Sequence, residues 1–318
     1  MGLAAWGQSK PQAETSEFDL SLLDGWLTPQ DLFFVREHFP APAVSVHGWK
    51  LTVGGAVEAP FEIPYDDLVQ QERRVLPVTL ECAENPVGGG LVSTAEWTGV
   101  SLASLVEKAR PRPEGRFVRL SAADGFTRTL PLVKALHADT LVVWGMNGNK
   151  LPGNHGFPLR AVVPGWYGMS SVKWLRAVEV TDREDTSEAY RRRLRSLLAG
   201  VRVAEPVGAV EVKSVFSRPL EAAILTGRRF VVRGAAWAGE KQVQTVEVST
   251  DGGKSWGRAG LGKPVPYTWS LWEYEWKIPG AGDYELVVRA DGQPAERAPE
   301  RVDEYEQNAW QRIRVTVK

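Results

Sequence analysis

The stretch GMNGNKLPGNHGFPLRAVVPGWYGMSSVKWL, residues 145–175, combines turn-forming pairs, strand-forming runs and many basic and hydroxyl side chains. Its Asn147-Gly148 pair is typical of a tight turn, here at the end of a strand that begins near residue 140. The β-branched runs at 158–165 and 172–180 predict two further strands. We therefore expect a strand-rich region whose loops carry functional side chains.

Upstream of this stretch the chain mixes strands with short helices. Strands are predicted at 47–55 and 77–82, and the apolar spacing in 101–109 predicts an amphipathic helix. Residues 116–132 indicate two strands around an Asp-Gly turn, followed by a short helix that begins at a proline. Strands and helices without regular alternation favour an α+β domain.

The length of 318 residues predicts two domains, because one hydrophobic core rarely grows so large. We expect a first domain over residues 1–185, a linker over 186–205 and a second domain over 206–318. The charge-dense segment 182–200 is predicted to be helical. Its basic side chains form either an anion-binding patch or a solvated helix face, and we favour the solvated face. These side chains are Arg191, Arg192, Arg193 and Arg195.

After the linker the pattern is all β. Residues 241–261 predict a hairpin, and 283–292 and 310–317 predict two more strands. Short strands at this spacing favour an antiparallel sandwich of the immunoglobulin type. In the segment 267–278 the apolar alternation changes phase near Leu271, which predicts either a bulge or burial on both faces.

The composition excludes several classes of protein. A net charge of −1 provides no overall electrostatic field that would attract nucleic acid. The sequence has no run of 18 apolar residues, so no membrane-spanning helix is predicted. One cysteine allows neither an intramolecular disulfide nor a Cys-x-x-Cys-His haem site. No export signal is visible, so the sequence as written predicts a cytoplasmic protein, or a periplasmic one if a signal has been removed.

The single cysteine, Cys82, lies in LECAENPVGGG (residues 80–90), at the end of a predicted strand and before a glycine-rich loop. A lone cysteine is most often a small buried hydrophobic residue. A nucleophile would need a nearby histidine base, and a zinc site would need further ligands at characteristic spacings. A thiolate bound to a transition metal that a cofactor carries needs only the one sulfur.

Three other segments gather basic and hydroxyl side chains beside glycine or proline. Each of these basic residues could be a surface cation, or a core histidine whose hydrogen bonds are all made within the protein. Together, however, they could bind a phosphate. The segments are FFVREHF with Arg36 and His38, NHGFPLR with His155 and Arg160, and GMSSVKW with Ser170, Ser171 and Lys173.

The motifs LECAEN, STAEWTGVSL, the 145–175 stretch and the late NAWQRIRV resemble the sulfite oxidase family of molybdenum enzymes. The resemblance covers nearly the whole chain. It implies a molybdopterin-binding α+β domain, followed by an immunoglobulin-like dimerisation domain and hence a possible homodimer. It also implies that molybdenum is held by two pterin sulfurs, oxo groups and the thiolate of Cys82.

The same resemblance assigns roles to the other residues. His38 would hold the pterin, Arg36 would lie near both cofactor and substrate, and Asp124 would contact the cofactor or simply form a turn. Trp97 would line the substrate pocket, and Tyr190, ahead of Tyr167, would supply a pocket tyrosine. His155, Arg160 and Lys173 would hold the phosphate and the pterin edge, with backbone amides near Ser170 and Ser171.

The chain departs from sulfite oxidases proper in two places. Val87 stands where those enzymes have an arginine that helps to bind the anion, and PYTWSLW lacks a second arginine. Charge-assisted hydrogen bonds to an anion contribute about 1.5–3 kcal/mol each, so a dianion would lose about two to four powers of ten in affinity. The motifs therefore indicate the molybdenum cofactor more strongly than they indicate sulfite.

The leading hypothesis is a molybdenum oxidoreductase that transfers an oxygen atom, with sulfite oxidised to sulfate. The alternative reaction is the reduction of an S- or N-oxide with the same cofactor. A third reading is a non-catalytic binding module in which Cys82 is merely buried. Because the chain has no haem motif, electrons would pass to a separate protein, such as a c-type cytochrome.

Overall fold

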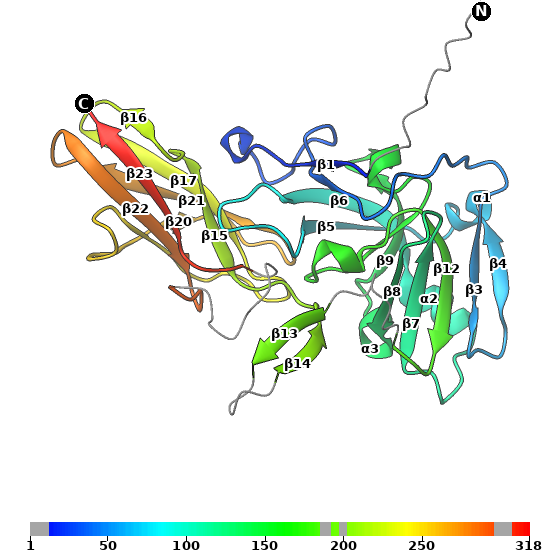
Figure 1. The fold of residues 1–318 in the computed structure, drawn as a ribbon. Coiled ribbons are helices and arrows are strands. Elements are labelled where there is room, and N and C mark those ends of the chain that lie inside the picture. The colour runs from blue at the N-terminus through cyan, green and yellow to red at the C-terminus, as the bar shows by residue number, and fades with distance from the viewer. Residues whose placement is uncertain (1–12, 185–191, 197–201, 296–306) are drawn as a thin grey trace, which may run out of the picture.

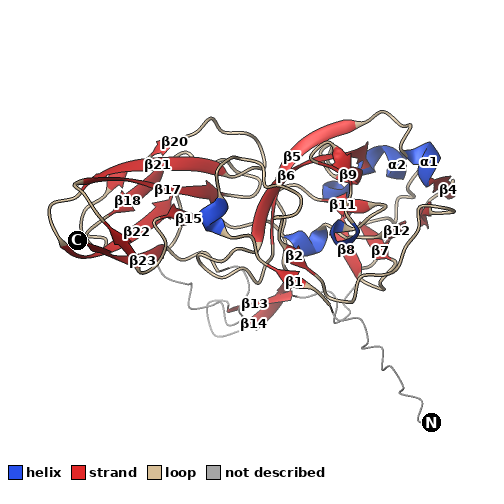
Figure 2. Ribbon diagram, turned by 90° about the horizontal axis from the view of Figure 1, so that it is seen from above, coloured by secondary structure: helices blue, strands red, loops and turns tan. Residues whose placement is uncertain are grey.

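The computed structural model describes residues 13–184, 192–196, 202–295 and 307–318. Two lobes lie side by side along the long axis of the molecule in both views (Figures 1 and 2). The N-terminal lobe carries the strands up to β12 (Leu175–Thr181), and the C-terminal lobe carries those from β15 (Lys213–Arg218) onward.

The N-terminal lobe contains two five-stranded sheets. One sheet has the order β10-β9-β6-β5, with β11 also paired to β9: Asn149–Lys150, Leu141–Met146, Val92–Ser101, Arg74–Glu81 and Arg160–Val162. The other has the order β4-β3-β12-β7-β8, with β4, β3, β7 and β8 at Phe61–Pro64, Lys50–Gly55, Phe117–Ala122 and Thr127–Pro131. Within the second sheet only β12 and β3 are parallel. A short pair, β1 (Thr15–Ser16) and β2 (Val35–Arg36), lies beside them.

Helices are few among the described residues, so this lobe is mostly β rather than a balanced α+β domain. The longest is α2 (Leu102–Lys108), where the amphipathic spacing predicted it, and its apolar face is buried. The helix α3 (Leu132–Ala135) begins after Pro131, also as predicted, and α1 is Tyr65–Leu68. The 3-10 turns are Leu20–Leu22, Gly153–His155 and Gly168–Ser170.

The stretch 145–175 crosses from one sheet to the other. Asn147 and Gly148 both have positive φ angles, 49° and 75°, and they turn β9 into β10 as the sequence predicted. The chain then contributes β11 to the same sheet before it enters β12 of the second sheet. Its loops therefore lie where the two sheets approach each other.

The C-terminal lobe is a sandwich of two sheets. One has the order β15-β17-β21-β20, and its last three strands are Arg229–Trp237, Ser270–Lys277 and Gly260–Leu261. The other has the order β16-β23-β22-β18-β19: Ala223–Leu225, Gln311–Val317, Gly282–Ala290, Val246–Ser249 and Gly257–Arg258. Both sheets contribute to one core, with Trp272 and Trp276 packing against Leu286 and Ile313. The hairpin and the two later strands predicted here are confirmed.

The phase change near Leu271 comes from burial on both faces. The register between β21 and β17 is continuous, so no bulge is present there. Trp272 lies in the core of the sandwich, whereas Leu271 packs against a second cluster between the lobes. That cluster joins residues of both lobes, including Phe18, Ala83, Val215 and Trp269.

The helix predicted over 182–200 is wrong where the structure describes this segment. Arg192–Ser196 forms strand β13, which pairs antiparallel with β14 (Arg202–Pro206). A high density of charge in the sequence does not by itself distinguish a helix from a strand. The proposed anion patch at Arg191, Arg192, Arg193 and Arg195 involves side chains outside the described set. Across the described ranges, no helix is both long and apolar enough to cross a membrane.

Candidate active site

A pocket in the N-terminal lobe gathers most of the side chains that the sequence singled out. It lies where the cysteine loop, strand β2 and the loops of the 145–175 stretch meet. Predicted residues that line it are Arg36, His38, Cys82, Asp124, His155, Arg160, Ser171 and Lys173. Segments more than a hundred residues apart therefore build one site.

Cys82 follows directly after β5 and lines the pocket, as a ligand-bearing strand end would require. Its backbone N–H donates to the Leu91 carbonyl over 2.9 Å, and its carbonyl accepts from the N–H of Asn85 over 3.0 Å. Burial raises the pKa of the thiol to about 11, although the backbone of Glu84 and the charge of Arg36 oppose the shift. The side chain is half-buried and lines the cavity, so it is not simply core packing.

Arg36 is neutralised by an acid of the cysteine loop. Its Nε and Nη2 donate to Oε2 of Glu84 over 3.0 and 2.7 Å, and its Nη1 donates to the carbonyl of Glu37 over 2.6 Å. Glu84 lines the same pocket and was missed from the sequence. The available signal was its place two residues after Cys82.

Lys173 pairs with a second carboxylate that the sequence analysis missed, Glu37. The Lys173 ammonium lies 3.4 Å from Oε1 of Glu37, donates to the Asn154 carbonyl over 2.8 Å and stands over the ring of Trp174. Burial lowers the pKa of Lys173 to about 8, and Glu37 opposes this shift. Glu37 itself is 2% exposed and also accepts from the N–H of Glu14. The pair holds a cation at the pocket wall.

Arg160 is a buried cation whose hydrogen bonds go to carbonyl oxygens. It donates to the carbonyls of His155 and Ser171 over 3.1 and 3.0 Å, and it is 5% exposed. Within the described ranges no carboxylate forms an ion pair with it. Burial lowers the pKa of Arg160 to about 9. A buried cation without a counter-anion is costly, so this position favours a bound anion.

His155 is held as a neutral ring. Its Nε2 lies 3.2 Å from the carbonyl oxygen of Gln30, which can only accept, so Nε2 carries the proton and Nδ1 keeps its lone pair. The ring meets the edge of Phe33. Burial, with the charge of Arg160, lowers the pKa of His155 to about 4. The ring can therefore accept a hydrogen bond at neutral pH.

His38 and Asp124 meet at Phe126. The imidazole of His38 stacks on the Phe126 ring at 4.9 Å with an interplanar angle of 11°. Oδ1 of Asp124 accepts from the N–H of Phe126 over 2.9 Å, which is the turn-forming role considered from the sequence. The same carboxyl lines the pocket, and burial raises its pKa.

Trp97, Ser170 and Tyr167 are not among the residues that line the pocket. Trp97 is fully buried below the guanidinium of Arg160, with its ring centre 4.9 Å away, so the expectation that it lines the pocket is wrong. It lies on β6, between β9 and β5, and β6 buries side chains on both of its faces. Ser170 is buried beside the pocket, and its Oγ has no hydrogen-bond partner in the described part of the chain. Tyr190 lies outside the described residues. Tyr167, the weaker choice, is buried, and its hydroxyl accepts from the N–H of Glu211.

The donor set fits a metal carried by a phosphorylated organic cofactor. No group of three or more His, Cys, Asp or Glu side chains could hold a metal among the residues that the structure describes. One sulfur, however, faces a cavity that also contains the uncompensated Arg160 and the cationic Lys173. The buried, unpartnered hydroxyl of Ser170 offers one more polar atom next to it.

Two family models match the chain. Residues 38–189 match the oxidoreductase molybdopterin binding domain, and residues 205–318 match the Mo-co oxidoreductase dimerisation domain. The two matches follow the two lobes of the structure.

Similar proteins come from animals, plants and bacteria. Sulfite oxidase of Gallus gallus is 32% identical over 85% of this chain and 67% of that protein, and mitochondrial sulfite oxidase of Homo sapiens is 30% identical over 93% and 63%. NADH nitrate reductase of Solanum lycopersicum is 30% identical over 92% of this chain and 39% of that protein. The chain thus spans about two thirds of the length of these sulfite oxidases.

The fold is similar to a solved bacterial structure. The sulfane dehydrogenase SoxCD from Paracoccus pantotrophus superposes with a TM-score of 0.87 at 27% sequence identity, covering 98% of this chain and 86% of that one. The likeness includes both lobes.

Proposed function

Because the chain belongs to the sulfite oxidase family of molybdopterin-dependent oxidoreductases, we propose that it transfers an oxygen atom at a molybdenum centre held by Cys82. The observation that carries this proposal is the position of the single thiol. Cys82 lines a pocket whose other walls present Arg160, Lys173 and the neutral ring of His155.

Each of these residues has a task in holding the cofactor. Arg160, with no carboxylate partner in the described ranges, would bind the phosphate, and Lys173 and Ser170 would add further donors. His155 would accept a hydrogen bond through Nδ1, and the His38–Phe126 stack would support the pterin. The thiol of Cys82 must lose its proton before it can bind a metal. When bound, the cofactor supplies a metal that exchanges two electrons and an oxygen atom.

The first substrate to test is sulfite, oxidised to sulfate. Support comes from the identity to two sulfite oxidases over most of this chain. The chain has no haem attachment motif, so electrons would leave to a separate carrier such as a c-type cytochrome. We further propose that the C-terminal lobe is an immunoglobulin-type sandwich that forms a homodimer, which its match to a dimerisation domain supports.

A second reaction, reduction of an S- or N-oxide, is supported by the Arg36–Glu84 pair. A pocket that binds the sulfite dianion needs uncompensated positive charge beside the thiol, and Glu84 already accepts from Nε and Nη2 of Arg36. An uncharged oxide needs only a hydrogen-bond donor there. The two reactions share the cofactor and differ in the substrate's charge.

Steady-state assays of the holoenzyme in both directions test these proposals. Sulfite-dependent reduction of an artificial electron acceptor supports the oxidase, and viologen-dependent reduction of methionine sulfoxide or trimethylamine N-oxide supports the reductase. Elemental analysis gives the molybdenum content of each preparation. Absence of molybdenum from protein made in a host that synthesises the cofactor contradicts both reactions.

A further inference from the structure

The side chains of Glu81, the last residue of β5, and of the next residue, Cys82, point in opposite directions. Cys82 faces the pocket, whereas the side chain of Glu81 enters the contact between the lobes. Successive side chains of an extended segment point to opposite faces, so whatever holds Glu81 also sets where Cys82 lies. Glu81 is fully buried, as is its ion-pair partner Lys213.

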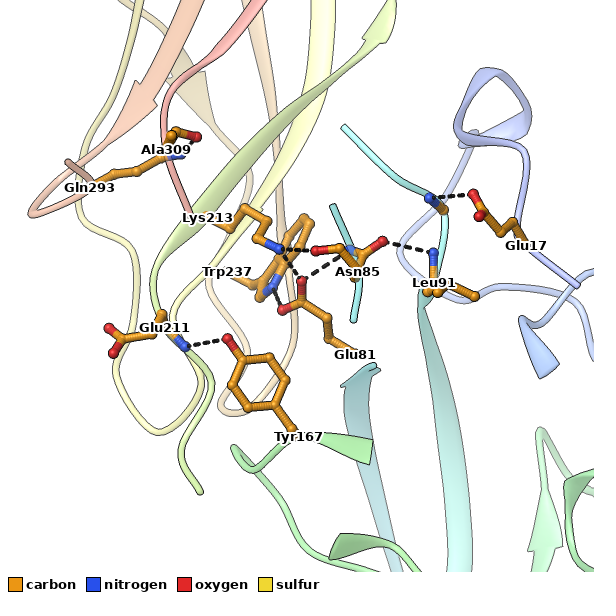
Figure 3. A network of polar contacts seen from close by, with 11 residues as sticks. Glu17, Glu81, Asn85, Leu91, Tyr167, Glu211, Lys213, Trp237, Gln293 and Ala309 are labelled. Atoms are coloured by element: carbon orange, nitrogen blue, oxygen red, sulfur yellow. Dashed lines mark hydrogen bonds and ion pairs between the residues drawn. The ribbon is translucent and has the colours of Figure 1, made fainter. Parts of the chain in front are cut away.

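Glu81 receives donors from both lobes (Figure 3). Its Oε1 lies 2.5 Å from the ammonium of Lys213, at the start of β15, and accepts from Nδ2 of Asn85 over 3.0 Å. Its Oε2 accepts from Nε1 of Trp237 over 2.7 Å. Lys213 and Trp237 both belong to the C-terminal lobe. They lie opposite each other where β15 pairs with β17.

The same lysine also braces the loop that follows Cys82. Its ammonium donates to the carbonyl of Asn85 over 3.1 Å, and Oδ1 of Asn85 accepts from the N–H of Leu91 over 3.0 Å. The N–H of Cys82 in turn donates to the carbonyl of Leu91. Lys213 of the C-terminal lobe therefore contacts the beginning of the cysteine loop at Glu81 and its middle at Asn85. Through Asn85 it is also linked to the end of the loop at Leu91.

Buried ion pairs seldom add net stability, because taking both charges out of water costs about as much as their attraction returns. Their clearest use is to fix one arrangement among several. A hydrophobic pair would hold the lobes together as well, but it would leave Asn85 and the Trp237 N–H without partners.

We propose that Lys213 is a positioning residue: through Glu81 and Asn85, the C-terminal lobe holds Cys82 in its metal-binding position. The lobe assigned to dimerisation is thereby also a part of the active-site scaffold. This inference rests on the proposed function only in treating Cys82 as the molybdenum ligand.

The test uses the single thiol as its own probe. In cofactor-free protein, the rate of labelling by a disulfide reagent reports the position and environment of Cys82 alone. Lys213→Met is compared with Lys134→Met, since Lys134 is also buried and lies 2.5 Å from Glu240 of the C-terminal lobe, away from the pocket. Circular dichroism first establishes that both variants are folded at the labelling temperature.

We expect Lys213→Met to change the labelling rate by about tenfold or more, and Lys134→Met to leave it within about twofold. The double variant Glu81→Gln/Lys213→Met leaves no unpaired buried charge, so it should fold even if the single variant does not, and should label at a rate between those of wild type and Lys213→Met. A wild-type rate in folded Lys213→Met overturns the proposal. So does an equal change in Lys134→Met, which would indicate general loosening between the lobes.

The holoenzyme gives an independent spectroscopic readout. The Mo(V) paramagnetic resonance signal should shift in Lys213→Met and stay unchanged in Lys134→Met, because only the first contact leads to the ligand. An unshifted signal in a fully loaded Lys213→Met enzyme overturns the proposal. If no preparation contains molybdenum, the proposed function fails, and the thiol rates still decide whether Lys213 positions Cys82.

Discussion

The Nη2 atom of Arg36 lies 2.7 Å from Oε2 of Glu84, two residues beyond Cys82. This pair places an acid and a base together at the pocket wall, with side chains that are 25% and 26% exposed. A negative substrate must therefore compete with a carboxylate that the chain itself provides. The charge of the pocket next to the thiol is set by Glu84 as much as by Arg36.

Removing this carboxylate should strengthen anion binding. In Glu84→Gln the guanidinium of Arg36 becomes available, and we expect sulfate to bind cofactor-free protein about tenfold more tightly, since the partly exposed pair is screened by solvent. Isothermal titration calorimetry measures the change, and the KM for sulfite of the loaded enzyme should fall in parallel.

Glu179→Gln is the matched control for that experiment. Glu179 pairs with Arg119 over 2.8 Å in the second sheet of the N-terminal lobe and does not line the pocket. Its removal should leave sulfate binding unchanged. Equal affinities in wild type and Glu84→Gln would show that Glu84 does not control the charge of the site.

Replacing the buried cation should reduce cofactor retention. Arg160→Met removes a guanidinium whose hydrogen bonds, within the described part of the chain, go to carbonyl oxygens, and a phosphate at this position would lose its charge-assisted hydrogen bonds. We expect the molybdenum content per chain to fall about tenfold or more. Mass spectrometry of the metal measures it, with Arg119→Met as a control for loss of a surface cation. Full metal content in Arg160→Met would place the phosphate elsewhere.

The neutral ring of His155 should make the cofactor-free protein sensitive to acid. Its pKa is about 4 in the folded protein against an ordinary 6.5, so the unfolded chain takes up the proton first as the pH falls. Stability is therefore lost as the pH falls from 6.5 to 4, by roughly 2–3 kcal/mol at pH 4.5 for this residue. Urea unfolding measures the free energy of unfolding at pH 7.5 and at pH 4.5. The decrease between the two pH values should be smaller in His155→Gln than in wild type by roughly 2–3 kcal/mol. Equal pH dependences in the two proteins would contradict the burial of a neutral ring.

Part of the candidate site follows local signals in the sequence. Cys82 comes at the end of a predicted strand, and the basic residues of 145–175 lie beside predicted turns and strands; the structure brings both segments to one pocket. The two carboxylates, Glu84 and Glu37, were missed because a pairing partner is chosen by the fold. Arg36 and Glu84 are 48 residues apart, and Lys173 and Glu37 are 136 apart.

The wrong predictions have a common cause. The motif predicts Trp97 in the pocket, but β6 buries side chains on both of its faces, and the motif does not decide which face meets the pocket. The segment Arg192–Ser196 was predicted to be helical from its charge density, although strand β13 forms through its pairing with β14. Pairing and face selection are tertiary effects, which composition does not encode.

The thiol of Cys82 should be unreactive at neutral pH in the cofactor-free protein. Burial raises its pKa to about 11 from 9.0, and the thiolate is the species that reacts. At pH 8 we therefore expect alkylation by iodoacetamide to be about a hundredfold slower than that of a model thiol. The rate should also rise about tenfold per pH unit from 7 to 10, whereas a model thiol levels off near pH 9. Since the chain has one cysteine, mass spectrometry of the intact protein follows this reaction alone, and a plateau below pH 9 would show that the sulfur faces a more polar environment than the pocket provides.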